Sequence, residues 1–154
     1  MNTNEQLIQH FYTCFKNKDY KGMQACYADD ATFSDAVFKN LSAAQVKAMW
    51  EMLIAKGKDM RIEFSNISAD EHTGRAHWDA YYTFSSTGKK VINKIDASFE
   101  FKNGKIIKHI DDFNFYTWAK QALGTTGILL GWTGFLRNKI QATAIGNLEK
   151  FMKK

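Results

Sequence analysis

Residues 95–115 read IDASFEFKNGKIIKHIDDFNF, and the alternation of apolar and polar side chains in this stretch decides the fold. Two strands, Ile95–Phe101 and Ile107–Phe115, are predicted on either side of Lys102-Asn103-Gly104, so the segment is expected to form a β-hairpin. The register of a hairpin determines which side chains share a face, because a shift of one residue moves a whole strand's side chains to the other side.

Two registers are compatible with this hairpin. A two-residue turn at Asn103-Gly104 would leave both faces half polar. A three-residue loop, with Gly104 in the left-handed bulge position, gives one almost wholly apolar face, and we expect this register. That face contains Asn93, Ile95, Ala97, Phe99, Phe101, Ile107, His109, Asp111, Phe113 and Phe115. We therefore expect Gly104 at positive φ and Ala97, not Asp96, beside His109 and Asp111.

The expected register places His109, Asp111 and Asn93 on the buried side of the sheet. An unpaired polar group costs roughly 1–3 kcal/mol in such a place, so these side chains need partners. His109 and Asp111 are two residues apart on one strand and project to the same side, so they can transfer a proton to or from a ligand. The alternative is a structural polar pair, satisfied by Asn93, Tyr82 or a tryptophan N–H.

The composition indicates one globular domain. The chain has 154 residues, of which 45% are hydrophobic, and no apolar run is long enough to span a membrane. Its beginning, MNTNE, lacks the basic and apolar regions of a signal peptide, so we expect a cytoplasmic protein. Cys14 and Cys26 fall on predicted apolar helix faces and are interpreted as buried free thiols.

The net charge of +5 comes entirely from the C-terminal part. Residues 1–115 hold 15 basic and 15 acidic side chains, whereas residues 116–154 hold six basic ones and Glu149 alone. No basic run is interleaved with aromatic residues on the strands, so a nucleic-acid partner is not expected.

The order of elements predicts an α+β fold. Helices begin at two predicted capping boxes, Thr3-Asn4-Glu5-Gln6 and Ser42-Ala43-Ala44-Gln45, and Asp19 can cap a short helix between them. Alternating strands then run from Met60 to Phe115. A curved antiparallel sheet that wraps N-terminal helices is expected, with a C-terminal helical extension, and its concave face can enclose a cavity.

Residues 27–35, YADDATFSD, follow two predicted helices and precede a capped third. This arrangement resembles the nuclear transport factor 2-like (NTF2-like) superfamily, which includes ketosteroid isomerase, limonene epoxide hydrolase and the SnoaL-like polyketide cyclases. The resemblance covers residues 4–117 by element order, so we expect one domain over 1–117 and an extension packed on it over 118–154. HIDDF (109–113) and WAKQALG (118–124) resemble a bacterial SnoaL-like subgroup of unassigned function.

The resemblance implies a cone-shaped fold with an apolar pocket, and it implies roles residue by residue. Asp35 falls where ketosteroid isomerase keeps its general base. The isomerase's oxyanion-hole tyrosine corresponds to Phe11 and its oxyanion aspartate to Ala97, neither of which can donate a hydrogen bond. In the polyketide cyclases the acid/base aspartate lies in a His-x-Asp context on the last strand, which His109-Ile110-Asp111 resembles. Asp111, His109 and Asp35 are therefore the candidate catalytic residues.

Aromatic side chains could line the pocket, although such spacings are also typical of plain core. The candidate pocket residues are Asn93, Trp78, Tyr82, Trp50, Phe113 and Phe11. No metal-ligand spacing, phosphate-binding loop or nucleophile motif occurs, so neither a metal nor a cofactor is expected. The first hypothesis is that the protein binds a small molecule. In its more specific form, the protein is a cofactor-independent acid/base enzyme that acts on a hydrophobic carbonyl compound. The rival is a non-catalytic dimerisation or protein-interaction module.

We expect two surfaces of the protein to make contacts. A homodimer, usual in this superfamily, is expected through the outer sheet face, where Tyr81 and Ile110 stand among charged residues. Residues 128–136, ILLGWTGFL, are too apolar to be left fully exposed to solvent. They either cover the open end of the cone, burying Leu129, Trp132 and Phe135, or lie on an anionic membrane. The sequence favours intramolecular packing, because the helix from Leu136 carries few charges; a membrane partner is not expected.

Overall fold

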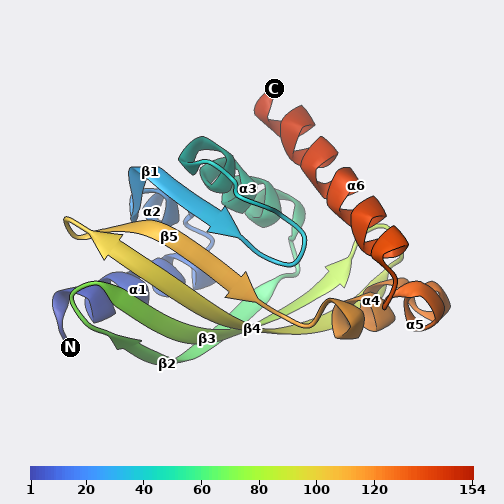
Figure 1. Cartoon of the computed structure of the whole chain (residues 1–154), viewed down its shortest axis with the longest axis horizontal. Coiled ribbons are helices and arrows are strands. Elements are labelled where there is room, and N and C mark those ends of the chain that lie inside the picture. Colours follow the sequence, from blue (N-terminus) through green and yellow to red (C-terminus); the bar gives the residue numbers. More distant parts are fainter.

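Five strands form one curved sheet in the order β1-β5-β4-β3-β2, and helices cover its inner face (Figure 1). The computed structural model describes all residues from Met1 to Lys154. The elements are α1 (Thr3–Lys16), α2 (Tyr20–Gln24), β1 (Tyr27–Ser34), α3 (Ala43–Lys56), β2 (Arg61–Ala69), β3 (Thr73–Phe84), β4 (Lys89–Lys102), β5 (Lys105–Asp112), α4 (Phe115–Leu123), α5 (Thr125–Leu130) and α6 (Gly134–Met152). The predicted α+β class and the helix-covered curved sheet are confirmed.

The sheet is mixed, which corrects the expectation of a wholly antiparallel one. β2, β3, β4 and β5 pair antiparallel, as consecutive strands joined by short turns do. β1 lies parallel to β5, with Phe33 beside His109 and Ser34 beside Ile110. A parallel pair needs a long connection, and here that connection contains α3 and three other strands.

The β4–β5 hairpin has the expected faces but a different turn. Lys102 pairs with Lys105 across a two-residue turn in which Asn103 and Gly104 both have positive φ, so the three-residue loop was wrong. The register then shifts between Glu100 and Phe101, where an extra residue in β5 forms a bulge. The bulge restores the apolar face, on which Ile106 replaces the expected Ile107 and Ala97 pairs with Asp111.

The helix starts agree with the capping signals, with one shift. Ser42 and Gln45 form the predicted capping box of α3, and Asp19 caps α2. The box of α1 is formed by Asn2 with Glu5, one residue earlier than expected. β5 ends at Asp112, so the predicted strand to Phe115 was too long; Asn114 caps α4 and Phe115 begins it.

The C-terminal helices pack on the sheet end and on α3. α4 buries Phe115, Trp118, Ala119 and Ala122 with Val91 of β4, and α6 lies along α3 and buries Leu136 and Leu148. Leu129, Trp132 and Phe135 remain 63%, 75% and 72% exposed, so their expected burial over the cone was wrong. The physical reason is that α4 already covers that end of the sheet. None of the helices has the length and apolarity needed to cross a membrane.

α5 depends on a glycine for its contact with α4. A Cβ atom at Gly127 would overlap the backbone carbonyl of Ala119, whereas a Cβ at Gly146 in α6 would touch nothing. We expect Gly127→Ala to lower the free energy of unfolding by about 1–3 kcal/mol, because backbone must move. Gly146→Ala should raise it by up to about 1 kcal/mol. Urea unfolding followed by circular dichroism measures both; equal effects would contradict the close α4–α5 contact.

Candidate functional site

A chain of hydrogen bonds runs through the buried interior and ends at Asp111. Trp50 Nε1 donates to Tyr27 Oη (2.9 Å), Tyr27 Oη lies 2.8 Å from His109 Nδ1, and His109 Nε2 lies 2.8 Å from Asp111 Oδ1. Trp78 Nε1 donates to the same Asp111 oxygen at 3.5 Å. Tyr27 comes from β1, Trp50 from α3 and His109 from β5, so the chain links three elements.

The donors fix the order of protons along this chain. Because the indole of Trp50 can only donate, the Tyr27 oxygen accepts from it and its O–H is left to donate to His109 Nδ1. His109 then carries its proton on Nε2 and donates to the carboxylate of Asp111. Every polar atom of Tyr27 and His109 has a partner in this arrangement, which holds the imidazole in one tautomer. Asp111 is held by His109 and Trp78 through one oxygen only.

Asp35 lies beside Asp111, at the end of the parallel strand pair. It follows Ser34, which pairs with Ile110. Its Oδ1 accepts the backbone N–H groups of Val37 (2.7 Å) and Phe38 (2.6 Å), so one oxygen serves the turn that follows β1. Burial raises the pKa of Asp35 to about 6, although these two hydrogen bonds lower it. A carboxyl group with such a pKa exchanges its proton readily near neutral pH.

Three polar groups near this end of the sheet keep atoms that no side chain or backbone group satisfies. They are the second oxygens of Asp111 and Asp35 and the side-chain amide of Asn93. Asn93 and Asp111 are buried, at 8% and 3% exposure, and Asp35 is half-buried. Carboxylate or amide atoms without a partner can hold or deprotonate a ligand that reaches them.

The candidate pocket residues divide into buried and partly buried side chains. Phe11, Trp50 and Trp78 are buried, and Phe11 and Trp50 pack against the His109 ring, so they form core beneath the polar groups. Tyr82 and Phe113 are only partly buried and contact both the main core and the small cluster around α4. Tyr82 accepts a hydrogen bond from Trp118 Nε1 at 2.8 Å. Tyr82 and Phe113 thus connect the two clusters.

The two main surface hollows lie elsewhere. One, of about 550 Å³, lies on the outer sheet face between β2 and β5, around Arg75, Ser98 and Lys108. The other, of about 620 Å³, lies between the start of α1 and the β4–β5 turn. Neither is lined by His109, Asp111 or Asp35. His, Cys, Asp and Glu side chains do not gather in groups of three or more that could bind a metal ion. Cys14 and Cys26 are buried and unpaired, as expected.

Tyr27 is the member of the site that the sequence did not reveal. It reads as one more aromatic residue in an apolar run, and its partner His109 is 82 residues away. A fully buried tyrosine needs a partner for its hydroxyl, and this requirement is the only signal that could have pointed to it.

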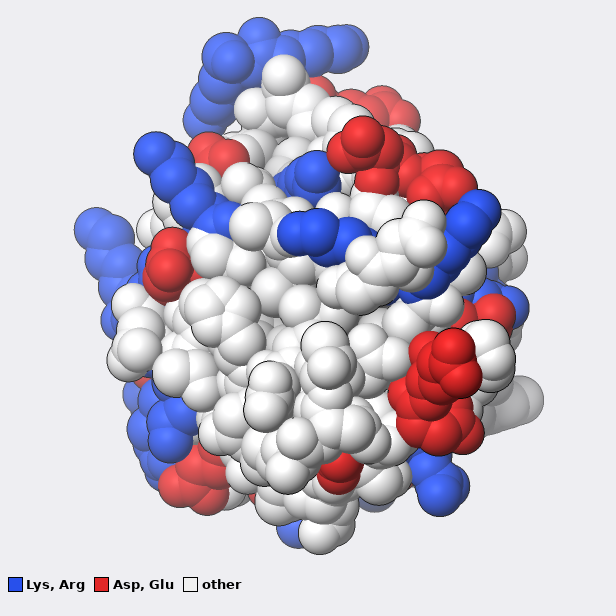
Figure 2. Space-filling view, turned by 90° about the vertical axis from the view of Figure 1, so that its left-hand side faces the viewer, with Lys and Arg blue, Asp and Glu red and all other residues white.

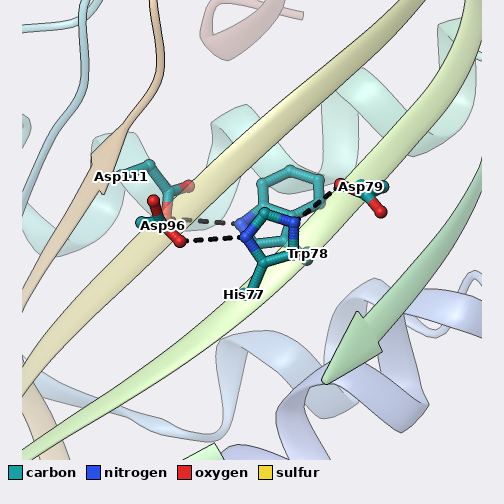
Figure 3. A network of polar contacts seen from close by, with 5 residues as sticks. All are labelled: His77, Trp78, Asp79, Asp96 and Asp111. Atoms are coloured by element: carbon teal, nitrogen blue, oxygen red, sulfur yellow. Dashed lines mark hydrogen bonds and ion pairs between the residues drawn. The ribbon is translucent and has the colours of Figure 1, made fainter. Parts of the chain in front are cut away.

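The outer face of the sheet carries a second, separate histidine network (Figure 3). His77 lies between two carboxylates, with Nδ1 2.9 Å from Asp96 and Nε2 2.8 Å from Asp79. The neighbouring Trp78 points to the inner face and reaches Asp111. His77, Asp79 and Asp96 are on the side away from the core, as the hairpin face predicted for Asp96, and the Asp96 side chain is 80% exposed.

This network should make stability depend on pH. The hydrogen bond with Asp96, and then that with Asp79, raises the pKa of His77 above its ordinary value, although partial burial lowers it. A raised pKa contributes stability below the unfolded value and loses it as pH rises through the folded value. We expect His77→Gln to cost about 1 kcal/mol or less near pH 6 and nothing near pH 9. Chemical denaturation at both pH values tests this; a constant difference would contradict it.

Comparisons with known proteins identify the family and the fold. The family model described as "SnoaL-like domain" matches residues 8–109. Among solved structures, IdmH, a proposed polyketide cyclase from Streptomyces antibioticus, is 18% identical, with 80% of this chain and 100% of that chain covered and a TM-score of 0.66. An LEH-like epoxide hydrolase from M. tuberculosis is 17% identical. The match covers 87% of this chain and 95% of that chain, with a TM-score of 0.63.

A third similar structure is an NTF2-like protein of unknown function from Burkholderia pseudomallei, which is 18% identical. The match covers 74% of this chain and 92% of that chain, with a TM-score of 0.65. No curated protein matches the chain. At these identities the structural neighbours establish the fold, and the family model covers most of the chain. The chain belongs to the SnoaL-like domain family of the NTF2-like superfamily.

Proposed function

We propose that this protein binds a small hydrophobic carbonyl compound and moves a proton of it by acid/base chemistry, without a cofactor. The observation that carries the proposal is the end of the buried hydrogen-bond chain. Asp111 is held by one oxygen, and its second oxygen has no hydrogen-bond partner, beside Asp35. A carboxylate fixed in this way is positioned to act as a general base.

The residues take separate roles in this proposal. Asp111 accepts the proton from the carbon next to the carbonyl, and His109 holds the carboxylate in place. Tyr27 and Trp50 fix the ring of His109 and are positioning residues. Asp35 and Asn93 contact polar groups of the ligand, while Tyr82 and Phe113 contact its apolar part. Steroid-isomerase chemistry has no support, because Phe11 and Ala97 offer no hydrogen-bond donor to an oxyanion.

Nuclear magnetic resonance tests this function directly. The protein is titrated with a panel of hydrophobic aryl ketones and 1,3-diketones, and backbone amide shifts are followed together with exchange of the ligands' α-protons in D₂O. We expect shifts at Asp35, Asn93, Asp111 and Phe113, and faster exchange for at least one compound. A panel that moves no resonance near Asp111 would overturn the proposal.

One observation favours the rival function, a non-catalytic interaction module. His109 and Asp111 bond directly to each other, and the two main hollows do not reach them. A purely structural pair would have the same geometry. The two functions predict different results for Asp35→Asn combined with Asn93→Ala: ligand shifts disappear if the groups bind a ligand, whereas a structural module shows no ligand shifts in either form.

We also propose a homodimer through the outer sheet face, with residues 118–154 as an extension packed on each copy. Ile92 and Ile110 are 47% and 38% exposed on this face, and the Arg61 guanidinium lies 3.9 Å from the centre of the Tyr81 ring. Such a mixed apolar and polar patch suits an interface between copies. We expect light scattering at high micromolar concentration to give a dimer and Ile110→Asp to give a monomer. A monomeric parent protein would end this proposal.

A further inference from the structure

The corner between α5 and α6 exposes an unusual concentration of large apolar side chains. Nine large hydrophobic residues of the chain are exposed, and five of them lie within residues 128–135. We call these five the apolar corner: Ile128, Leu129, Leu130, Trp132 and Phe135. They are 53%, 63%, 41%, 75% and 72% exposed. Scattered exposed apolar residues are ordinary, but a contiguous group of this kind marks a contact surface.

The charged side chains of the segment that carries the apolar corner are all positive. No acidic residue occurs between Phe113 and Leu148. Lys120 lies over the ring of Tyr116, whose hydroxyl donates to the carbonyl of Ile128, and Arg137 lies over the ring of Phe115. Lys89 lies beside Gly124, and Lys139 is exposed on α6. The opposite end of the molecule, in contrast, carries charges of both signs side by side (Figure 2).

We propose that the apolar corner and its surrounding cations dock the protein on the surface of an anionic membrane. The corner stands at one end of the molecule, beyond the sheet, so it can enter the headgroup region without disturbing the core (Figure 1). Trp132 donates its Nε1–H to the carbonyl of Leu129, which holds the indole at the tip of the corner. Tryptophan favours the membrane interface, and lysine and arginine favour anionic headgroups.

Charge complementarity distinguishes this partner from a second copy of the chain. Two corners placed face to face would bring Lys89, Lys120, Arg137 and Lys139 of each copy together with no carboxylate from residues 113–148 to neutralise them. An anionic lipid surface supplies the opposite charge. Because Trp132 and Phe135 are exposed, the intramolecular packing that the sequence favoured does not occur, and membrane docking takes its place in the proposal. Docking does not depend on proton transfer at Asp111, so either proposal can fail alone.

Vesicle co-sedimentation of the full chain tests the docking. We expect binding to phosphatidylcholine vesicles that contain about 30% phosphatidylglycerol, weak binding to pure phosphatidylcholine, and loss of binding in about 0.5 M salt. Trp132→Ser with Phe135→Ser should reduce partitioning by about tenfold or more. Arg137→Glu with Lys139→Glu should reduce it by at least about fivefold for each cation lost. Met152→Ser, which removes an exposed apolar side chain at the far end of α6, is the matched control.

Fluorescence supplies a second readout. Trp132 is 75% exposed, whereas Trp50, Trp78 and Trp118 are 1%, 5% and 6% exposed, so a blue shift on vesicle addition reports on Trp132. Trp132→Phe should bind but lose this shift. Equal binding to anionic and neutral vesicles, or equal losses in Met152→Ser and the corner variants, would overturn the proposal. Self-association that disappears in the corner variants, without vesicle binding, would assign the corner to a second copy instead.

Discussion

Replacement of Asp111 by asparagine is expected to slow α-proton exchange of a bound ketone by roughly 100- to 10,000-fold, the range that a general base contributes. The asparagine side-chain oxygen can still accept from Trp78 and His109, so the shape of the site is kept. What disappears is the carboxylate oxygen that would take the proton. The measurement is the exchange rate in D₂O of the compound that the titration identifies, at a saturating concentration.

The neighbouring carboxylate provides the control for this prediction. Asp112 is adjacent in sequence but points to the exposed outer face of β5, so Asp112→Asn should leave the exchange rate unchanged. Circular dichroism must show that both variants remain folded. An Asp111→Asn protein as active as the parent would remove Asp111 from the mechanism and leave Asp35 as the remaining carboxylate.

Replacement of Trp50 by alanine should have the largest effect on stability, about 3–5 kcal/mol. The side chain is 1% exposed and packs against Phe15, Phe33 and Trp78. Its removal would leave a large void and would also deprive the buried Tyr27 hydroxyl of its donor. Urea unfolding at constant pH measures the loss, and an unfolded variant would be the extreme of the expected range.

Two further variants separate packing from hydrogen bonding. Trp50→Phe keeps an aromatic ring but lacks the N–H, so it should cost about 1–3 kcal/mol. Trp132→Ala removes an exposed tryptophan of the same chain and should change stability by less than about 0.5 kcal/mol. If Trp50→Ala and Trp132→Ala were equally stable, the buried position of Trp50 would be wrong.

The face of the β4–β5 hairpin could be predicted because alternation records burial directly. Asn93, Ala97, His109 and Asp111 are all inward, and Asp96 is outward, as the pattern indicated. The turn could not be predicted from the same pattern, because a loop residue and a bulge residue shift the register by the same amount. The chain places the extra residue inside β5, near Ile107, and keeps the two-residue turn that Asn103-Gly104 favours.

The candidate site was predictable only where polarity conflicts with the pattern. His109 and Asp111 interrupt an apolar face and therefore draw attention, whereas Tyr27 and Trp50 fit apolar faces and do not. Their roles depend on which hydroxyl or indole N–H meets the histidine, and this is decided by packing between β1, α3 and β5. The exposure of Trp132 could not be predicted for a similar reason, since it depends on α4 already occupying the end of the sheet.

The parallel pairing of β1 with β5 has a consequence for synthesis on the ribosome. β1 leaves the ribosome early, but its only partner in the sheet is made about 80 residues later. At synthesis rates of roughly 5–20 residues per second, β1 waits about 4–16 s for it. During that time Tyr27 and Phe33 lack their contacts with His109, and the nascent chain exposes an unpaired edge. We therefore expect chaperones to bind this segment of the nascent chain. We also expect slow codons between β2 and β5 to delay the release of the chain from those chaperones.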